Sequence, residues 1–268
     1  MRRLGLTLAV VLVVLFCTGP FLWQLLTSLR PENELTSLDF PSSLTLESYR
    51  SVLTGRPFAR SVLNSFLVAS ATTATSLFFG ATAAFALAKL EIRGQRFFLG
   101  MALLASMFPG VAVVSPLYLT VRALGLRDHL LGLVLPYTTF ALPMAVWILS
   151  GFFRAIPDEI YRAAIIDGCS PFQAFRKIML PLAAPGLGTT AILLFISSWN
   201  EFLYALALTS SARSRTVPVA IGLFSGDHKE PWGEIAAASV VAMLPVILVA
   251  LVFQRWIAAG LTTSAGKQ

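Results

Sequence analysis

Four polar residues recur at helical spacing near the end of a long apolar run. They are Ser197, Asn200, Glu201 and Tyr204, in the segment SSWNEFLY. Their i, i+3, i+4, i+7 spacing would place them on one face of a continuous helix. Hydroxyl, amide, carboxylate and aromatic groups together can bind a ligand that is rich in hydroxyl groups. The spacing therefore predicts a polar binding face, and Tyr118 and Tyr137 in two other apolar runs are further candidates for it.

A second interpretation of this segment remains open. Glu201 is the only acidic residue inside any of the long apolar runs, and an ionisable group in a bilayer is costly unless it faces a partner or a wet cavity. Counted from Ala184 at 1.5 Å per residue, however, Glu201 lies about 25 Å along its helix. At that depth it could simply reach the far interface, with Trp199 and Tyr204 in a belt of interfacial aromatic residues.

The elements that would position these residues are membrane helices. Hydrophobic residues make up 56% of the 268 residues, charged residues make up 12%, and the mean hydropathy is +0.78. Long apolar runs, uncharged except for Glu201, cover about residues 4–29, 61–88, 97–121, 130–153, 182–209 and 235–254. Each is long enough to cross the hydrocarbon core, and none alternates as barrel strands do. We expect an all-α membrane protein with six transmembrane helices in one domain, residues 1–268.

Several single residues refine this expectation. The first run is too long for a secretion signal and lacks a cleavage site, so we expect a retained helix. Five prolines are expected to interrupt the helices: Pro109, Pro116, Pro136, Pro143 and Pro245. Cys17 and Cys169 are expected to be free thiols. No His, Cys, Asp and Glu pattern predicts a metal site, and no phosphate-binding loop of the GxxxxGK[ST] type occurs.

Basic residues indicate the orientation. With both termini in the cytoplasm, Lys and Arg are more frequent on the cytoplasmic side once the long first outer loop, Arg30 to Arg60, is discounted. The net charge of +7 then belongs to a rim that faces anionic lipid and a protein partner. Nothing in the sequence is typical of a nucleic-acid-binding module.

This topology places a polar segment of about residues 157–181 in the cytoplasm, between the fourth and fifth spans. It contains YRAAIIDGCSPFQAFRKIMLP. Pro157 favours a helix start and Gly168 favours its end. Ser170, Pro171 and Gln173 then form a capping-box pattern that starts a second helix, running to about Leu180. We call this segment the 157–181 loop.

Each predicted helix of the 157–181 loop carries one apolar stripe. The stripes are Ile160, Ala163, Ala164 and Asp167 on the first helix, and Phe172, Phe175 and Met179 on the second. Helices of about ten residues are marginal alone and need a surface to pack on. Two surfaces are compatible with the pattern: the lipid interface, and a cytoplasmic protein that docks on the loop.

The 157–181 loop resembles the EAA loop of ABC importer permeases. The matching residues, in the family's register, are Ala163, Ala164, Gly168, Ile178, Leu180 and Pro181, with Asp167 before the glycine. Arg162 stands where the family has glutamate, and Glu159, one turn earlier, could supply that contact. The resemblance implies that the loop couples to an ATPase subunit through Glu159, Arg162, Ala163, Ala164, Asp167, Gly168, Phe172 and Phe175.

Other segments extend the resemblance over nearly the whole chain. They are FPGVAVVSPLY, LPYTTFALPMAVWILSGFFRAIPDEI, SWNEFLYALALT and QRWIAAGLTTSAGK. They resemble the second permease subunit of maltose-type and trehalose-type sugar importers. This implies a type I permease bundle in the inner membrane, a second and different permease, two ATPase subunits and an extracytoplasmic sugar-binding protein or lipoprotein. No cofactor is expected on this chain, since ATP and Mg²⁺ would bind the ATPase.

Alternatives from other classes fit less well. An ion-coupled secondary transporter should have several buried charges and paired broken helices, and only Glu201 is available. A membrane enzyme should gather a nucleophile, a base or metal ligands at one depth, whereas His129 and His228 lie in predicted outer loops. Residues 210–234 are expected to form a solvated connector, or by resemblance a contact with the binding protein. The tail from Gly260 is expected to be flexible, or by resemblance to reach between the ATPase subunits.

Overall fold

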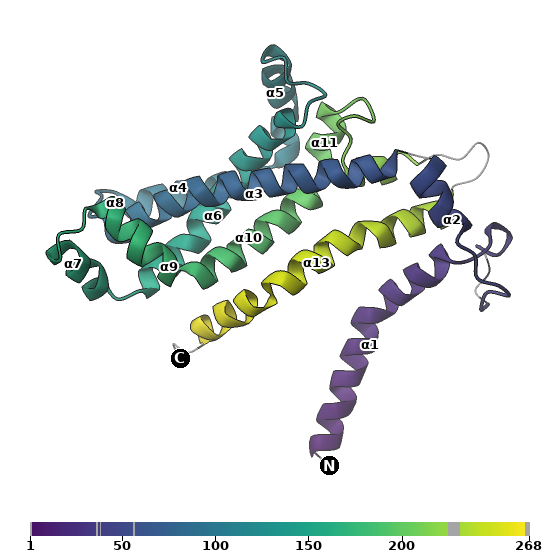
Figure 1. The fold of residues 1–268 in the computed structure, drawn as a ribbon, viewed down its shortest axis with the longest axis horizontal. Helices are drawn as coiled ribbons and strands as arrows, with labels where there is room; N and C mark the ends of the chain where they lie inside the picture. The colour runs from purple at the N-terminus through teal and green to yellow at the C-terminus, as the bar shows by residue number, and fades with distance from the viewer. Residues whose placement is uncertain (1, 36, 38, 56, 225–230, 266–268) are drawn as a thin grey trace.

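The computed structural model describes residues 2–265 except 36, 38, 56 and 225–230, and describes no side chains for residues 2–4 or from 255 onward. Every element in this range is helical (Figure 1). The α-helices are α1 (Arg2–Ser28), α2 (Glu47–Arg50), α3 (Phe58–Lys89), α4 (Gln95–Ser106), α5 (Gly110–Ala123), α6 (Leu131–Ala155), α7 (Asp158–Ile166), α8 (Pro171–Ala174), α9 (Leu180–Leu182), α10 (Ala184–Trp199), α11 (Leu203–Leu208), α12 (Val217–Gly222) and α13 (Trp232–Ala265). A 3₁₀ turn, η1 (Glu32–Glu34), and two π-helical turns, η2 (Ser51–Gly55) and η3 (Phe175–Met179), complete the list.

Four helices are long and apolar enough to cross a membrane unbroken: α1, α3, α6 and α13. The other two predicted spans are bent. Helices α4 and α5 meet at 90°, and the helical segment Pro171–Leu182 meets α10 at 76°. Six spans are therefore obtained only if each bent pair counts as one. The break over 97–121 confirms the interruption expected at Pro109. The break inside 182–209, where α10 ends at Trp199 and α11 begins at Leu203, was not predicted, because hydropathy alone does not show where a helix turns.

A proline lies beside each of these two bends, since Pro185 is in the first turn of α10. Pro109 directly precedes α5, at the 90° bend. The other four prolines singled out in the sequence lie inside α5, α6 and α13, which continue through them. Interruption was therefore wrongly predicted for Pro116, Pro136, Pro143 and Pro245. Within a membrane bundle, neighbouring groups can compensate for the backbone hydrogen bond that a proline removes.

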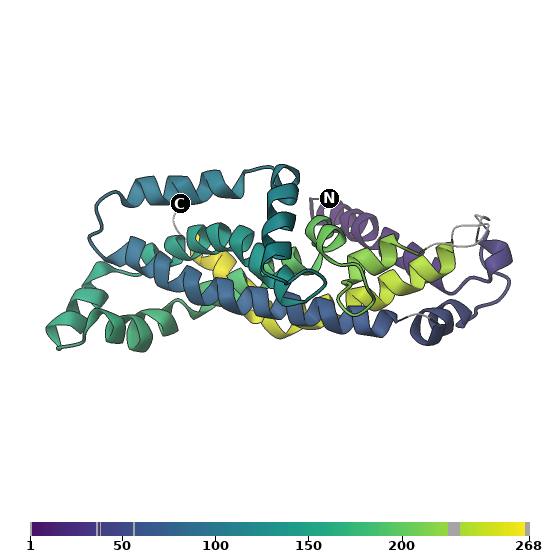
Figure 2. The same ribbon diagram turned by 90° about the horizontal axis from the view of Figure 1, so that it is seen from above.

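Helices α3 and α6 form the most extensive contact of the bundle, with α10 and then α13 packed beside them (Figures 1 and 2). Small side chains allow the close approach of α3 and α6, as is typical of membrane helices. A Cβ atom on Gly80 would lie 2.7 Å from the Cβ of Ala145. The hydroxyls of Thr75 and Thr138 are joined by a 2.8 Å hydrogen bond between the two helices.

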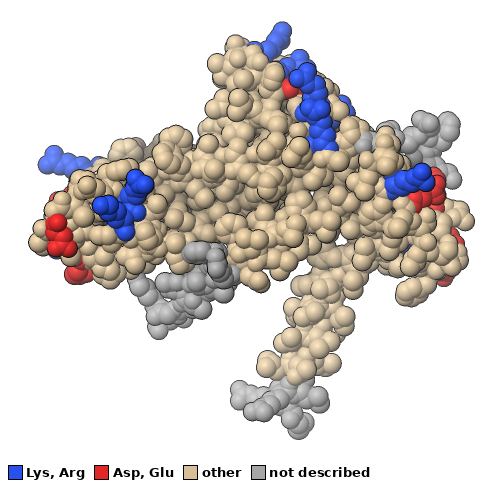
Figure 3. Space-filling view, in the orientation of Figure 1, with Lys and Arg blue, Asp and Glu red and all other residues tan. Residues whose placement is uncertain are grey.

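Charged side chains gather near the ends of the bundle and beside α5, and leave a broad uncharged band on the face shown in Figure 3. This distribution is that of a protein whose middle lies in hydrocarbon. Helix α1 contacts α13 and diverges from the bundle toward its N-terminal end (Figure 1). Its most apolar stretch has no buried residue. Lipid or another subunit must therefore cover α1.

The segment between α11 and α13 is partly folded into the bundle. Thr216, Val217 and Val219 are buried, and the backbone N–H of Val217 donates to Oγ of Ser65 on α3 at 2.8 Å. A solvated connector was therefore the wrong expectation for residues 210–224. Residues 225–230, including His228, and the tail residues 266–268 lie outside the described part of the chain.

Candidate functional site

The 157–181 loop begins with α7, whose C-terminal end has the geometry predicted from Gly168. The backbone N–H of Cys169 donates to the carbonyl of Ala164, and that of Gly168 to the carbonyl of Ile165, both at 3.0 Å. This pair of bonds is a Schellman motif, which requires a residue with positive φ. Gly168 has φ of +88° and open space around its Cα. Its role is therefore to reverse the chain direction, a role that glycine fills without strain.

The second helix of the 157–181 loop begins with the predicted capping box. Oγ of Ser170 accepts from the N–H of Gln173 at 3.3 Å, and the Gln173 side chain accepts from the N–H of Ser170 at 2.8 Å. The helix then passes through the π-helical turn η3 before α9 ends at Leu182. Local sequence signals thus correctly predicted both helices, although not the π-helical turn.

An aromatic cluster fixes the loop to the bundle. Phe85 of α3 lies at ring-centroid distances of 4.9 Å from Phe175, 5.9 Å from Phe153 and 5.8 Å from Tyr161. Phe153 is completely buried and belongs to α6. The cluster therefore joins α3, α6 and both parts of the loop. Aromatic pairs of this kind contribute about 0.5–1.5 kcal/mol each beyond their buried area.

Lys89 adds a polar connection at the same end of the bundle. This last residue of α3 has a side chain that is only 1% exposed. Its Nζ donates to the carbonyl of Ile156 at 2.6 Å and to Oδ1 of Asp158 at 2.5 Å. The hydrogen bond and charge of Lys89 hold the pKa of the Asp158 carboxyl below its ordinary value. The first residues of the loop are thus tied to the end of α3.

The remaining surface of the loop points away from the bundle. Glu159, Arg162, Ala163, Asp167, Gly168 and Phe172 are exposed, whereas Ala164 and Phe175 are buried. Of the predicted stripe on α7, only Ala164 packs inward, and Ile160, Ala163 and Asp167 are exposed. Large apolar side chains are also exposed: Ile166 is 84% exposed and Phe172 is 66% exposed. Such residues in a polar segment are typical of an interaction surface.

The second candidate region contains a break in the fifth span. Helix α10 ends at Trp199, and α11 begins at Leu203. The carboxylate of Glu201 accepts hydrogen bonds from the backbone N–H groups of Tyr204 at 2.7 Å and Ala205 at 3.0 Å. A carboxylate at this position satisfies free N–H groups at the start of a helix. Glu201 therefore stabilises the restart of the helix.

The break separates the residues predicted to share one face. Tyr204 is buried, stacks on Phe140 at 5.0 Å, and donates its hydroxyl to the carbonyl of Gly110 at 3.1 Å. Tyr137 is also buried, and its hydroxyl faces the Glu201 carboxylate without a well-formed hydrogen bond in the described structure. Tyr118 packs beside them under the guanidinium of Arg127. The three tyrosines are thus brought together, with Tyr137 and Tyr204 in the interior of the chain and Tyr118 half-buried beside them.

Ser197 and Asn200 lie elsewhere, exposed near the end of α10. Nδ2 of Asn200 donates to the carbonyl of Ile196 at 2.8 Å, so its side-chain oxygen stays available to a ligand or partner. Trp199 is buried and stacks on Phe195, which rules out the predicted belt position for this residue. One continuous polar face over these four positions was therefore wrong.

Sequence reasoning missed Lys89 and Phe85. Each looks ordinary in its own run, since a lysine commonly ends a membrane helix and a phenylalanine commonly lies within one. Their partners are 67 to 90 residues further along the chain, so local spacing carries no signal of these contacts. In the described residues, no group of three or more His, Cys, Asp or Glu side chains could hold a metal ion. Cys17 and Cys169 are free thiols, as predicted.

Known proteins resemble this chain over most of its length. Residues 76–263 match the family described as the binding-protein-dependent transport system inner membrane component. The trehalose transport system permease protein SugB of Mycobacterium tuberculosis is 46% identical, with 96% of this chain and 94% of that protein covered. The trehalose/maltose transport system permease protein MalG of Thermococcus litoralis is 37% identical, with 100% and 98% covered.

Solved structures show the same fold. A chain of a bacterial ABC transporter involved in the import of the acidic polysaccharide alginate has a TM-score of 0.78 at 25% identity, with 95% of this chain and 96% of that chain covered. None of these relatives supports an ion-coupled secondary transporter. With its membrane-spanning helices, the protein is a multi-pass protein of the inner membrane. The chain therefore belongs to the family of inner membrane components of binding-protein-dependent transport systems, and it is a type I permease subunit of an ABC importer.

Proposed function

We propose that this chain forms half of the membrane path for a sugar, a di- or oligosaccharide of the trehalose or maltose class, together with a second, different permease. The relatives named for trehalose and for trehalose/maltose transport cover nearly the whole chain. Two ATPase subunits bind ATP and Mg²⁺ and drive the cycle, and an extracytoplasmic binding protein or lipoprotein delivers the sugar. Both termini lie in the cytoplasm.

The observation that carries the coupling part of this proposal is the 157–181 loop. Its inner side is fixed to α3 and α6 by Lys89 and the aromatic cluster. Its outer side exposes Ile166 and Phe172 beside charged residues. A segment that is rigidly joined to the bundle and apolar on its free side can transmit the movement of a docked ATPase. Arg162 and Glu159 are both exposed on α7 and can supply its ion pairs.

The sugar path is assigned by exposure. A path between two permeases must be lined by residues that a single chain leaves exposed. Ser197 and Asn200 meet this requirement, whereas Tyr137 and Tyr204 are buried within the chain. We therefore assign Ser197 and Asn200 to the path. Glu201, Tyr118, Tyr137 and Tyr204 support the wall behind it.

The coupling proposal is tested by charge substitutions on the loop. Ile166→Asp and Phe172→Asp should each reduce the amount of ATPase that co-purifies with the chain, at unchanged yield of folded permease, since a carboxylate is costly to bury in an apolar contact. Phe40→Asp is the matched control, because Phe40 is 90% exposed and lies in the first loop, before α2. Normal ATPase recovery with both loop variants would contradict docking and would favour a loop that lies on lipid.

The substrate is tested separately. Cells that lack this chain should lose uptake of one labelled sugar from a panel containing trehalose, maltose and longer glucosides, and regain it when the chain is restored. Methionine and alginate oligosaccharides serve as controls from other ABC importers of this fold. Loss of uptake for a control compound alone would refute the assignment to the trehalose or maltose class while leaving the ATPase docking result intact.

A further inference from the structure

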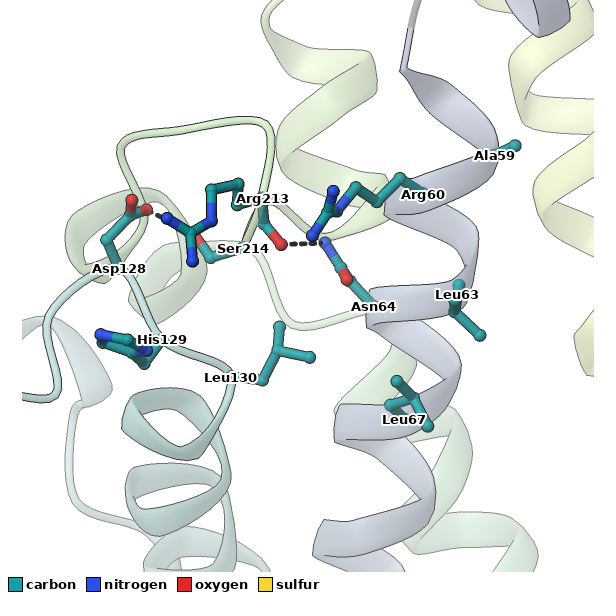
Figure 4. A pocket seen from close by; sticks show the side chains of 10 residues that line it. All are labelled: Ala59, Arg60, Leu63, Asn64, Leu67, Asp128, His129, Leu130, Arg213 and Ser214. Atoms are coloured by element: carbon teal, nitrogen blue, oxygen red, sulfur yellow. Dashed lines mark hydrogen bonds between the residues drawn. The ribbon is translucent and has the colours of Figure 1, made fainter.

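A pocket of about 630 Å³ lies at the end of the bundle opposite the 157–181 loop (Figure 4). Three segments that are distant in sequence build it: the start of α3, the connection between α5 and α6, and the loop after α11. Its lining residues are Ala59, Arg60, Leu63, Asn64, Leu67, Asp128, His129, Leu130, Arg213 and Ser214. Neither the coupling loop nor the assigned sugar path contributes to it.

Hydrogen bonds to the loop after α11 give this pocket a defined shape. Nδ2 of Asn64 donates to the carbonyls of Arg213 at 3.0 Å and Arg215 at 2.9 Å. The carboxylate of Asp128 accepts from the N–H groups of Ser210 and Ser211 at 2.8 and 3.0 Å, and from the hydroxyls of Ser211 and Ser214. The backbone that carries Arg213 is therefore held in place from two sides.

The charges in the pocket leave a positive excess for a ligand. Both oxygens of Asp128 are engaged by the serine loop. The guanidinium groups of Arg60 and Arg213 have no hydrogen bond or ion pair with other described residues. Figure 4 shows Arg60 reaching from α3 toward the loop that carries Arg213, whose own side chain extends to the Asp128 side of that loop, so the two guanidinium groups lie on either side of the loop backbone. A phosphate group is well matched to two arginines, because each guanidinium can donate two parallel hydrogen bonds.

The position of Arg60 along α3 indicates that the phosphate belongs to a lipid headgroup and is not free in solution. Arg60 precedes Lys89 by 29 residues (89 − 60), which is about 44 Å of helix. A bilayer with its headgroups is about 40–45 Å thick. When Lys89 lies at one headgroup layer, Arg60 lies at the other. Leu63 and Leu67, respectively 56% and 47% exposed, follow Arg60 along α3 toward the hydrocarbon, where an acyl chain would run.

We propose that this pocket binds an anionic phospholipid of the phosphatidylglycerol class. Arg60 and Arg213 hold its phosphate, and Leu63, Leu67 and Leu130 contact its acyl chains. The predicted orientation places these arginines at the outer surface, against the usual cytoplasmic preference of basic residues. A bound anionic headgroup provides the reason for their position. This inference does not depend on which molecule is transported.

The test uses the complete transporter, purified from nanodiscs with equal phosphatidylglycerol and phosphatidylcholine, and native mass spectrometry to count retained lipids. Arg60→Gln and Arg213→Gln should each lower retained phosphatidylglycerol about fivefold, the effect of one basic residue near a membrane surface. Arg122 is an exposed arginine outside the pocket, so Arg122→Gln should leave the amount of retained phosphatidylglycerol unchanged. Added inorganic phosphate should not displace the lipid. The melting temperature confirms that each variant is folded.

Three outcomes would overturn the proposal. The first is retention of phosphatidylglycerol by both pocket variants at the level of the wild-type transporter. The second is equal retention of phosphatidylcholine and phosphatidylglycerol by the wild type. The third is that the Arg60→Gln and Arg213→Gln variants retain lipid normally but bind the extracytoplasmic binding protein more weakly. That result would assign the two arginines to a protein contact instead.

Discussion

The side chain of Lys89 is almost fully buried, and both of its acceptors belong to the start of the 157–181 loop. Replacing it by methionine keeps the apolar stem and removes the donors. We expect Lys89→Met to assemble normally but to lower the stimulation of ATP hydrolysis by sugar-loaded binding protein about two- to tenfold, the range for one buried hydrogen bond. Purified transporter in liposomes provides the assay.

Lys177→Met is the control for this substitution, because Lys177 is exposed on η3 of the same loop. If the ratio of stimulated to basal ATP hydrolysis were the same for the two variants, Lys89 would have no role in coupling beyond that of an exposed lysine of the loop. A fall in assembled complex with an unchanged ratio would assign Lys89 to stability alone.

Asp128 allows a prediction about pH. Partial burial raises the pKa of its carboxyl, but hydrogen bonds from Ser211 and Ser214 and from two backbone N–H groups outweigh this and hold it well below the usual range. A carboxyl whose pKa is lowered on folding stabilises the protein above its unfolded pKa of about 3.9, and this contribution is lost as pH falls further.

We therefore expect Asp128→Asn to destabilise the permease by about 1 kcal/mol, after allowance for its solvent exposure. The difference in melting temperature from the wild type should be constant between pH 8 and pH 5 and should shrink below about pH 4. Asparagine tolerates the positive φ of 62° at this position, so backbone strain is not added. A difference that changes near neutral pH would show that another group titrates there.

At the scale of elements, the contact between α3 and α6 depends on Gly80. Gly80→Ala would place a methyl group 2.7 Å from the Cβ of Ala145, so the helices must separate. We expect a loss of about 1–3 kcal/mol in stability, the usual cost of overpacking. Gly100→Ala, in α4 with open space around the new atom, should instead stabilise by about 0.4–1 kcal/mol. Unfolding of the two variants in the same detergent gives the comparison, and a shift in the same direction for both would refute the close contact.

Local elements were predictable wherever the signal was contained in a few neighbouring residues. Gly168 and the Ser170 capping box specify their turn by backbone conformation and adjacent hydrogen bonds, and both were correctly predicted. The break at Pro109 was predicted from that proline, whereas the break near Asn200 was missed, because the spacing of its polar residues is also that of a continuous helix. The inward partners of Lys89 and Tyr204 were also missed, since they come from distant segments and depend on how the helices pack.

For the whole transporter, residues that are exposed in one chain should differ in function from those that are buried in it. Asn200→Ala should raise the half-saturating sugar concentration about two- to tenfold, the effect of one hydrogen bond to a neutral sugar. Tyr204→Phe removes the hydroxyl that binds the Gly110 carbonyl, so it should lower stability and leave the half-saturating concentration unchanged. Uptake measured against sugar concentration, per assembled complex, distinguishes the two. The opposite pattern would place Tyr204 in the path and Asn200 outside it.

The separation of α1 from the bundle has a consequence for biosynthesis. Helix α1 is translated before the other described helices, and its most apolar stretch needs no contact with them to be stable in a bilayer. Helix α3 follows it and is different, because the buried hydroxyls of Thr72 and Ser76 face a bundle that has not yet been translated. A chain paused after α1 is a complete membrane anchor, whereas a chain paused after α3 carries polar groups that still lack their surroundings. We therefore expect α1 to leave the insertion machinery before α3 does.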